Sequence, residues 1–185
     1  MSYNFTDEHE IKSLARSFRK GIEQAQSLRQ FQKDISFYRF PAGCCGDASY
    51  LLAEYFHQNG IESIWVSNER GDWSHAWLVI KDDRVKTPIL KRFTWPKELQ
   101  GIVKGYGADE PEKEHIITSY THDDIKDGLI VDITGDQFND YDKSVYVGIS
   151  DTFHDSFEFI QANDYEGLND GRLSMLYEKI VRQME

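Results

Sequence analysis

Apolar side chains recur at every third or fourth position in three stretches of the chain, and this spacing predicts amphipathic helices. The helices are expected at residues 7 to 34, 45 to 58 and about 169 to 183. The second helix follows Phe40-Pro41-Ala42-Gly43, where proline disfavours a helical residue before it and glycine permits a sharp turn. It is expected to end at Asn59-Gly60, a pair that favours a left-handed helix stop. We expect each helix to bury its apolar stripe in the core.

Alternating apolar and polar residues, or short apolar runs, predict β-strands elsewhere in the chain. These strands are expected at residues 61 to 66, 74 to 81, 129 to 133, 144 to 149 and 157 to 160. We expect them to form one antiparallel sheet, so that the fold class is α+β.

The pattern is lost between residues 84 and 127, where prolines, glycines and many charged residues interrupt it. We interpret this stretch as an insertion with a short helix near residues 96 to 102, and insertions of this length often carry function. The chain has 185 residues, a length that fits one domain, residues 1 to 185, with the insertion included.

The composition excludes several classes of protein. With 39% hydrophobic and 14% aromatic residues, the chain is neither collagenous nor disordered. Its first residues are polar and acidic, and no stretch approaches the roughly 18 to 20 apolar residues that a bilayer span needs. We therefore expect a cytoplasmic protein with no membrane partner.

The charge balance narrows the partners further. Lys and Arg number 21 against 32 Asp and Glu, a formal net charge of −11, which repels phosphate backbones, and we expect no nucleic-acid partner. The histidines and cysteines lack zinc-site spacing, and no glycine-rich phosphate loop is found, so we expect no metal or cofactor. The oligomeric state is left open.

The chemistry of the chain centres on Cys44 and Cys45, adjacent residues that rarely form a relaxed disulfide. Cys45 is expected to open a helix, where backbone amides and the helix dipole favour a thiolate. The competing interpretation is that a buried cysteine acts as a small hydrophobe. A shift of one residue in the helix start would exchange the roles of the two thiols.

Two further residues make the chemical interpretation more specific. His75 stands at the start of a predicted strand, and Asp132 interrupts the apolar run of another. A buried charge at Asp132 is costly unless it is paired. If the two strands are neighbours, the carboxylate can accept the imidazole proton and stabilise the imidazolium that a thiolate needs.

The motifs Gly43-Cys44-Cys45-Gly46-Asp47-Ala48-Ser49, Ser74-His75-Ala76-Trp77-Leu78-Val79 and Leu129-Ile130-Val131-Asp132-Ile133-Thr134 suggest a family. In this order they resemble the transglutaminase-like branch of the papain-like cysteine protease superfamily, over roughly residues 40 to 135. The resemblance implies a papain-like fold in which the cysteine-bearing helix packs on an antiparallel sheet. It also implies a catalytic triad of Cys45 as nucleophile, His75 as base and Asp132 as orienting acid.

The resemblance implies cysteine-dependent chemistry on amide bonds of a protein or peptide substrate, through a thioester acyl-enzyme. Peptidase, amidase, glutamine deamidase and transglutaminase activities all remain open, and so does a non-catalytic binding module on the same scaffold. The chain departs from the family because His75 and Asp132 lie 57 positions apart, where a short hairpin is usual. A second oxyanion donor is not identified, with Trp73, Tyr38, Gln30 and Gln32 as candidates.

Overall fold

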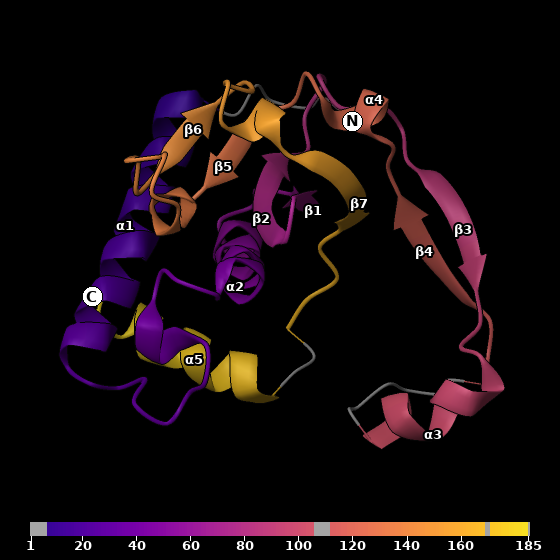
Figure 1. Ribbon diagram of the computed structural model, residues 1–185, viewed down its shortest axis with the longest axis horizontal. Helices are drawn as coiled ribbons and strands as arrows, with labels where there is room; N and C mark the ends of the chain where they lie inside the picture. Colours follow the sequence, from indigo (N-terminus) through magenta and orange to yellow (C-terminus); the bar gives the residue numbers. More distant parts are fainter. Residues whose placement is uncertain (1–6, 106–111, 169–170, 185) are drawn as a thin grey trace.

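The fold is α+β, as predicted, in a computed structural model that describes residues 7–105, 112–168 and 171–184. One antiparallel sheet has five strands in the order β6-β5-β2-β1-β7. The strands are β1 (Ser63–Arg70), β2 (Trp73–Ile80), β5 (Ile130–Asp132), β6 (Tyr146–Gly148) and β7 (Glu158–Asp164). The helices α1 (Glu8–Ser27), α2 (Cys45–Gln58) and α5 (Gly171–Val181) pack together at the sheet, with α2 against β1 and β2 (Figure 1).

Helix α1 is shorter than the predicted helix over residues 7 to 34. It ends at Ser27 because Arg29 takes a left-handed φ of 58°. The amide of Gln30 donates to the carbonyl of Ala25, and that of Arg29 to Gln26, which is the paired hydrogen bonding of a Schellman stop. The chain then folds back, so that Phe31 is buried although it lies outside the helix.

The second predicted helix is confirmed, since α2 runs from Cys45 to Gln58. The predicted strand over residues 61 to 66 is too short, because β1 continues to Arg70. Its polar end is held by ladder hydrogen bonds to β2 on one side and β7 on the other, and such pairing overrides weak strand propensity. A two-residue turn with Gly71 at φ 60° joins β1 to β2.

Apolar side chains are buried on both faces of the sheet. On one face Leu78 and Ile80 of β2 join the core formed with the helices. On the other face Trp77 and Val79 of the same strand pack with Phe157 and other aromatic residues from the segment before β7. Both faces of the sheet are therefore covered by other parts of the chain at its central strand, β2.

The insertion at residues 84 to 127 contains a two-stranded hairpin that the sequence pattern did not predict. Strands β3 (Ile89–Phe93) and β4 (His115–Ser119) form a separate hairpin, with α3 (Lys97–Gly105) at its end and α4 (His122–Ile125) where the chain returns. The predicted helix near residues 96 to 102 corresponds to α3. The hairpin extends away from the main sheet as an arm (Figure 1).

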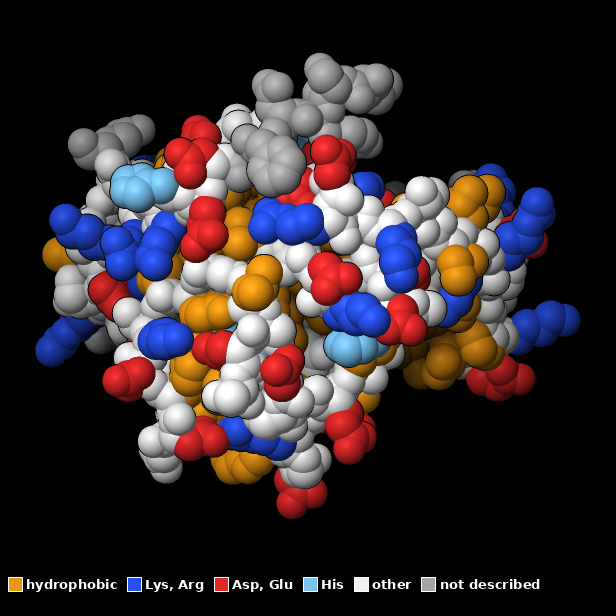
Figure 2. Space-filling view, turned by 90° about the horizontal axis from the view of Figure 1, so that it is seen from above, with side chains coloured by type: hydrophobic (Ala, Val, Ile, Leu, Met, Phe, Trp, Pro, Cys, Tyr) orange, Lys and Arg blue, Asp and Glu red, His pale blue; other side chains and the backbone are white. Residues whose placement is uncertain are grey.

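Hydrophobic side chains gather on this arm, at the right of Figure 2. Those that are exposed include Leu90, Ile102 and Ile116. Strand β3 is exposed along its whole length, which explains why its two-residue periodicity is too weak to predict it. Among the described residues, no helix is long and apolar enough to cross a bilayer.

Candidate active site

The first residue of α2 is Cys45, with Cys44 as the N-cap residue. Gly43 precedes them with a φ of 72°, a left-handed conformation that glycine adopts without strain. The hydroxyl of Ser49, one turn into α2, donates to the carbonyl of Ala76 in β2 at 3.0 Å, and both groups are buried. This bond fixes the start of α2 across the strand that carries His75.

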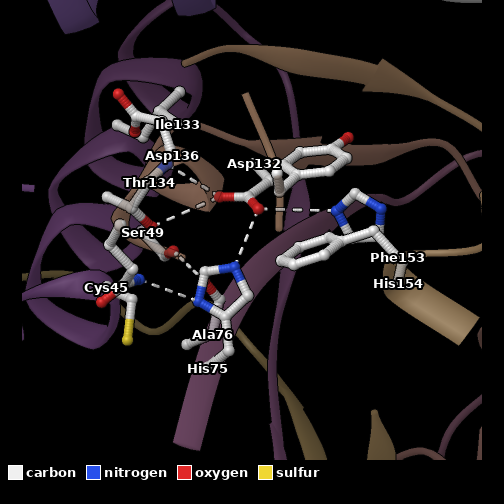
Figure 3. A network of polar contacts seen from close by, with 12 residues as sticks. Cys45, Ser49, His75, Ala76, Asp132, Ile133, Thr134, Asp136, Phe153 and His154 are labelled. Carbon is white, nitrogen blue, oxygen red and sulfur yellow. Dashed lines mark hydrogen bonds and ion pairs between the residues drawn. The ribbon is translucent and has the colours of Figure 1, made fainter. Parts of the chain in front are cut away.

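The strands that carry His75 and Asp132 are neighbours, because β2 pairs with β5. This meets the condition under which the two side chains were expected to interact. His75 Nε2 lies 2.8 Å from Asp132 Oδ2, and both side chains are buried. Figure 3 shows the imidazole of His75 between Cys45 and Asp132. The structure thus brings together the three residues that the sequence singled out.

The carboxylate of Asp132 is held by more than His75. Its other oxygen, Oδ1, accepts hydrogen bonds from the backbone amide of Thr134 at 2.8 Å and from the Thr134 hydroxyl at 3.3 Å. Burial by itself raises the pKa of Asp132, but the charge and the hydrogen bond of His75, together with the nearby ring of His154, outweigh it and hold that pKa well below its ordinary value. Asp132 is therefore an anion whose orientation is fixed.

The two cysteines have opposite environments. Cys44 is buried, its thiol donates to the carbonyl of Pro41 at 3.3 Å, and burial raises the pKa of Cys44. Cys45 is partly exposed, with its Sγ 4.0 Å from the carbonyl oxygen of Ser74. Burial also opposes ionisation of Cys45, yet the hydrogen bond and charge of His75 outweigh it and lower the pKa of Cys45. The geometry favours Cys45 as the thiolate.

The environment of His75 complements that of Cys45. Burial disfavours the imidazolium, but the charge and hydrogen bond of Asp132, together with Cys45, raise the pKa of His75 to about 9. Four aromatic rings surround the imidazole at centroid distances of 5.0 to 6.0 Å: Trp77, Phe138, Phe153 and Phe157. These rings exclude water, which strengthens the interaction between His75 and its charged neighbours.

Gln137 belongs to the site, although the sequence analysis did not identify it. It ends the short 3-10 helix Gly135–Gln137 that follows Asp132. Its Nε2 lies 3.2 Å from His75 Nδ1, and its Oε1 accepts from the backbone amide of Gly43 at 3.2 Å. A hydrogen bond from Gln137 also contributes to lowering the pKa of Cys45. No local sequence signal marks this residue, because its role depends on how the chain returns after β5.

His154 is a second residue that the sequence analysis did not assign to the site. It is buried, with Nε2 3.5 Å from Asp132 Oδ2 and Nδ1 2.7 Å from Asp151 Oδ1. The spacing Asp151-x-x-His154 at a helix start is a signal that could have found the pair, since an aspartate there caps the turn. It could not have predicted the contact with Asp132.

The residues named as oxyanion candidates are less well placed. Trp73 starts β2 but is 68% exposed. Tyr38 and Gln32 line a different cavity with Arg29 and Phe31. The side-chain amide of Gln137 is closer to Cys45 than these residues and is a better candidate for the second donor to the oxyanion.

A cavity of about 530 Å³ begins at Gly46 and Asp47, the two residues that follow Cys45. It runs beside Trp65 of β1 and the residues of β7, and Ile117 of the arm contributes to its lining. A larger cavity of about 680 Å³ lies at the face that carries Trp77 and His154. Cys45 and His75 line neither of the two cavities, but only the smaller one is lined by residues adjacent to Cys45 in the chain. The smaller cavity is therefore the one positioned to hold a group that reacts with Cys45.

No protein-family model, no curated protein and no solved structure was found to match this chain. A proposal about its activity therefore rests on its own residues and their geometry.

Proposed function

We propose that this chain is a cysteine-dependent hydrolase or acyl transferase that acts on amide bonds, with Cys45, His75 and Asp132 as a catalytic triad on a papain-like fold of the transglutaminase type. One observation carries the proposal: the buried 2.8 Å contact between His75 and Asp132, made on the side of the imidazole opposite Cys45 at the start of α2. Structural histidines rarely need both a buried carboxylate and a thiol with a lowered pKa.

In the first step the Cys45 thiolate attacks the amide carbonyl carbon and a C–S bond forms. The carbonyl oxygen becomes an oxyanion that the backbone amide of Cys45, at the helix start, is placed to stabilise. The C–N bond then breaks as the His75 imidazolium gives its proton to the leaving nitrogen. The products of this step are a thioester on Cys45 and a free amine or ammonia.

In the second step neutral His75 removes a proton from water or from an acceptor amine, which attacks the thioester carbonyl. Collapse of this intermediate breaks the C–S bond and returns the thiolate and imidazolium pair. Asp132 stays ionised throughout and keeps Nε2 of His75 as the protonated nitrogen that faces it. Water gives hydrolysis or deamidation, and an amine gives acyl transfer.

The substrate is proposed to place the group next to its amide in the 530 Å³ cavity that starts at Gly46. Aromatic side chains of Tyr50 and Trp65 and the amides of Gln161 and Asn163 line this cavity. Such a lining suits a protein or peptide segment with both apolar and polar groups.

The test uses an electrophilic amide probe that acylates nucleophilic cysteines, with labelled sites located by peptide mass spectrometry. Wild-type protein is expected to be labelled at Cys45. Cys45→Ser is expected to lose labelling, while Cys44→Ser, the matched control one position away, keeps it. Loss of labelling in Cys44→Ser alone would mean that Cys44, and not Cys45, is the nucleophile. If Cys44 and Cys45 were labelled equally slowly, as in the unfolded chain, the result would contradict the catalytic proposal.

A second candidate function is a non-catalytic binding module that uses the arm as its partner surface. The specific observation in its favour is the exposure of apolar side chains on the arm, among them Leu90 (67% exposed) and Ile116 (61% exposed), which often marks an interaction surface. This candidate requires Cys45 to react like an ordinary thiol, so the labelling experiment separates the two functions.

A further inference from the structure

The larger of the two cavities, of about 680 Å³, has no role in the proposed function. It lies on the face of the sheet that carries Trp77 and Val79, opposite the face that packs on α1, α2 and α5. Its walls come from β1, β2, β5, β7 and α4 and are mostly apolar or aromatic, with Val66, Ile130 and Phe157 among their buried residues. A cavity of this size and lining is typical of a small-molecule site.

One buried polar side chain in this lining lacks a hydrogen bond. Asn68 of β1 is 3% exposed, and its Nδ2 has no hydrogen-bond partner among the described residues. An unpaired donor of this kind destabilises the fold, whereas a leucine of similar size would not. The asparagine at this position therefore indicates a polar group that is bound in the cavity.

The pairing of β1 with β7 changes register beside Asn68. Ser67 lies opposite Gln161. The next residue, Asn68, lies opposite Phe159, so that Ile160 is an extra residue of β7. This β-bulge gives Phe159 the face that Ile160 would take in a regular strand, and bulges often reorient a side chain in this way beside a functional site. Phe159 thus lines the cavity next to Asn68, while Ile160 is 48% exposed.

The rim of the cavity selects against negative charge. Its exposed carboxylates are those of Asp127, Asp155 and Glu158, against one lysine, Lys126. The Nζ of Lys126 lies 2.9 Å from a carboxylate oxygen of Asp123, which offsets its charge. A negative rim disfavours an anionic ligand, so an uncharged one fits the cavity better.

The cavity is a separate site that shares one wall with the candidate triad. The rings of Trp77 and Phe157 line the cavity, and each has its centroid 5.5 Å from that of the His75 imidazole. Cys45, His75 and Asp132 do not line it. A ligand in the cavity would therefore contact the rings that surround His75 without touching the reacting groups.

We propose that this cavity binds a small, uncharged aromatic compound, which packs against the rings of Trp77, Phe157 and Phe159 and accepts a hydrogen bond from the side-chain amide of Asn68. Rotation about the Cβ–Cγ bond of the asparagine turns its NH2 group toward the ligand. The aromatic rings supply contact area, and the amide fixes the orientation of the ligand. The proposal does not depend on the proposed function, because no residue of the triad takes part.

The experiment titrates quinoline, an uncharged two-ring compound with one acceptor nitrogen, into nitrogen-labelled protein and follows the side-chain N–H signals by NMR. We expect saturable shifts for the Asn68 amide and the Trp77 indole, and no shift for the indole of Trp65, which lines the smaller cavity. Naphthalene has the same shape but no acceptor, and it is expected to bind about tenfold more weakly. Quinoline-6-carboxylate is expected to bind about tenfold more weakly because of the acidic rim.

Asn68→Leu is expected to weaken quinoline binding about tenfold, to leave naphthalene binding unchanged, and to keep or raise the melting temperature, because an unpaired buried amide is removed. Gln24→Leu is the matched control, since it removes an exposed amide of α1 outside the cavity, and it should bind quinoline as the wild type does.

Three results would overturn the proposal. Quinoline and naphthalene could bind wild-type protein equally, or Asn68→Leu could keep the wild-type affinity for quinoline. Shifts could centre on Trp65, or fail to saturate at millimolar quinoline. Finally, the Asn68 amide could stay in contact with a long-lived water when quinoline is present, which would mean that solvent is its partner. None of these readouts needs enzymatic activity.

Discussion

Adjacent cysteines acquire different chemistry here because one is the N-cap and the other is the first helical residue. The thiol of Cys44 turns back to the carbonyl of Pro41 and into the core, where burial favours the neutral form. Cys45 faces β2, where the His75 imidazolium and the free amides of the helix start favour the thiolate. A single step along the backbone therefore separates a thiol whose pKa is raised from one whose pKa is lowered.

Gln137 is expected to support the thiolate directly. Gln137→Ala removes the amide that lies 3.2 Å from His75 Nδ1 and that also lowers the pKa of Cys45. We expect the alkylation rate of Cys45 at pH 6 to fall about tenfold, as for the loss of one hydrogen bond to a charged group, and to recover at high pH. The measurement is the rate of iodoacetamide modification of Cys45 against pH.

The control for this variant is Gln32→Ala, an exposed glutamine after α1, which should leave the rate unchanged. If Gln137→Ala has the wild-type profile, the amide of Gln137 has no electrostatic role at Cys45.

The three proposed catalytic residues could be selected from the sequence because each is an unusual residue type for its predicted position. They are a cysteine at a helix start, a histidine at a strand start and an aspartate within an apolar run. The residues that support them, Gln137 and His154, could not be selected. Their roles arise from contacts between segments distant in the chain, and their neighbours in the sequence resemble ordinary loops. Local sequence patterns can therefore reveal a residue that is unusual for its own helix or strand, but they cannot reveal contacts between distant segments.

At the scale of elements, the short 3-10 helix Gly135–Gln137 is packed directly against the anion of the site. A Cβ at Gly135 would lie 2.7 Å from a ring carbon of Tyr141 and 2.9 Å from Asp132 Oδ2. Neither neighbour is free to move, because Tyr141 stacks on Phe153 at 3.9 Å and Asp132 is held by His75 and Thr134. The turn after β5 therefore depends on a residue without a side chain.

Gly135→Ala is expected to lower the free energy of unfolding by about 1 to 3 kcal/mol, the usual cost of overpacking, and to reduce Cys45 alkylation by displacing Asp132. Gly101→Ala in α3 is the control, because no atom lies within 4 Å of its added Cβ. It should be neutral or slightly stabilising. Urea denaturation followed by circular dichroism measures both variants, and equal stabilities would mean that Gly135 is not tightly packed.

The elements themselves were predicted to different extents. Helix α2 and strand β2 follow their sequence periodicity closely. The end of α1 was missed because Arg29 takes a left-handed conformation that the apolar stripe does not signal. The arm was missed because β3 is exposed along its length, so that no buried face imposes alternation on its sequence.

At the scale of the whole molecule, the site is made by three segments that meet only in the folded chain: the start of α2, strand β2 and the end of β5. The resemblance in motif order predicted this convergence, and the pairing of β2 with β5 provides it. The insertion does not interrupt the pairing, because it leaves the sheet after β2 as an arm and returns through α4 before β5. A long insertion is tolerated since closing a longer loop adds little entropy cost.

In the proposed function, Cys45 and His75 form a thiolate and imidazolium pair in the folded protein. The lowered pKa of Cys45 and the raised pKa of His75, about 9, define a pH window in which both are charged. Below this window the thiolate is protonated, and above it His75 loses its proton while the thiolate remains. The rate of Cys45 alkylation should therefore stay high from about pH 9 down to the lowered pKa of the thiol.

The most direct measurement is the alkylation rate of Cys45 by iodoacetamide as a function of pH, in Cys44→Ser protein, folded and in urea. We expect the folded protein to keep its reactivity well below the ordinary thiol pKa of about 8.5, while the unfolded protein loses about tenfold per pH unit. Superimposable profiles for the folded and unfolded protein would contradict the thiolate and imidazolium pair.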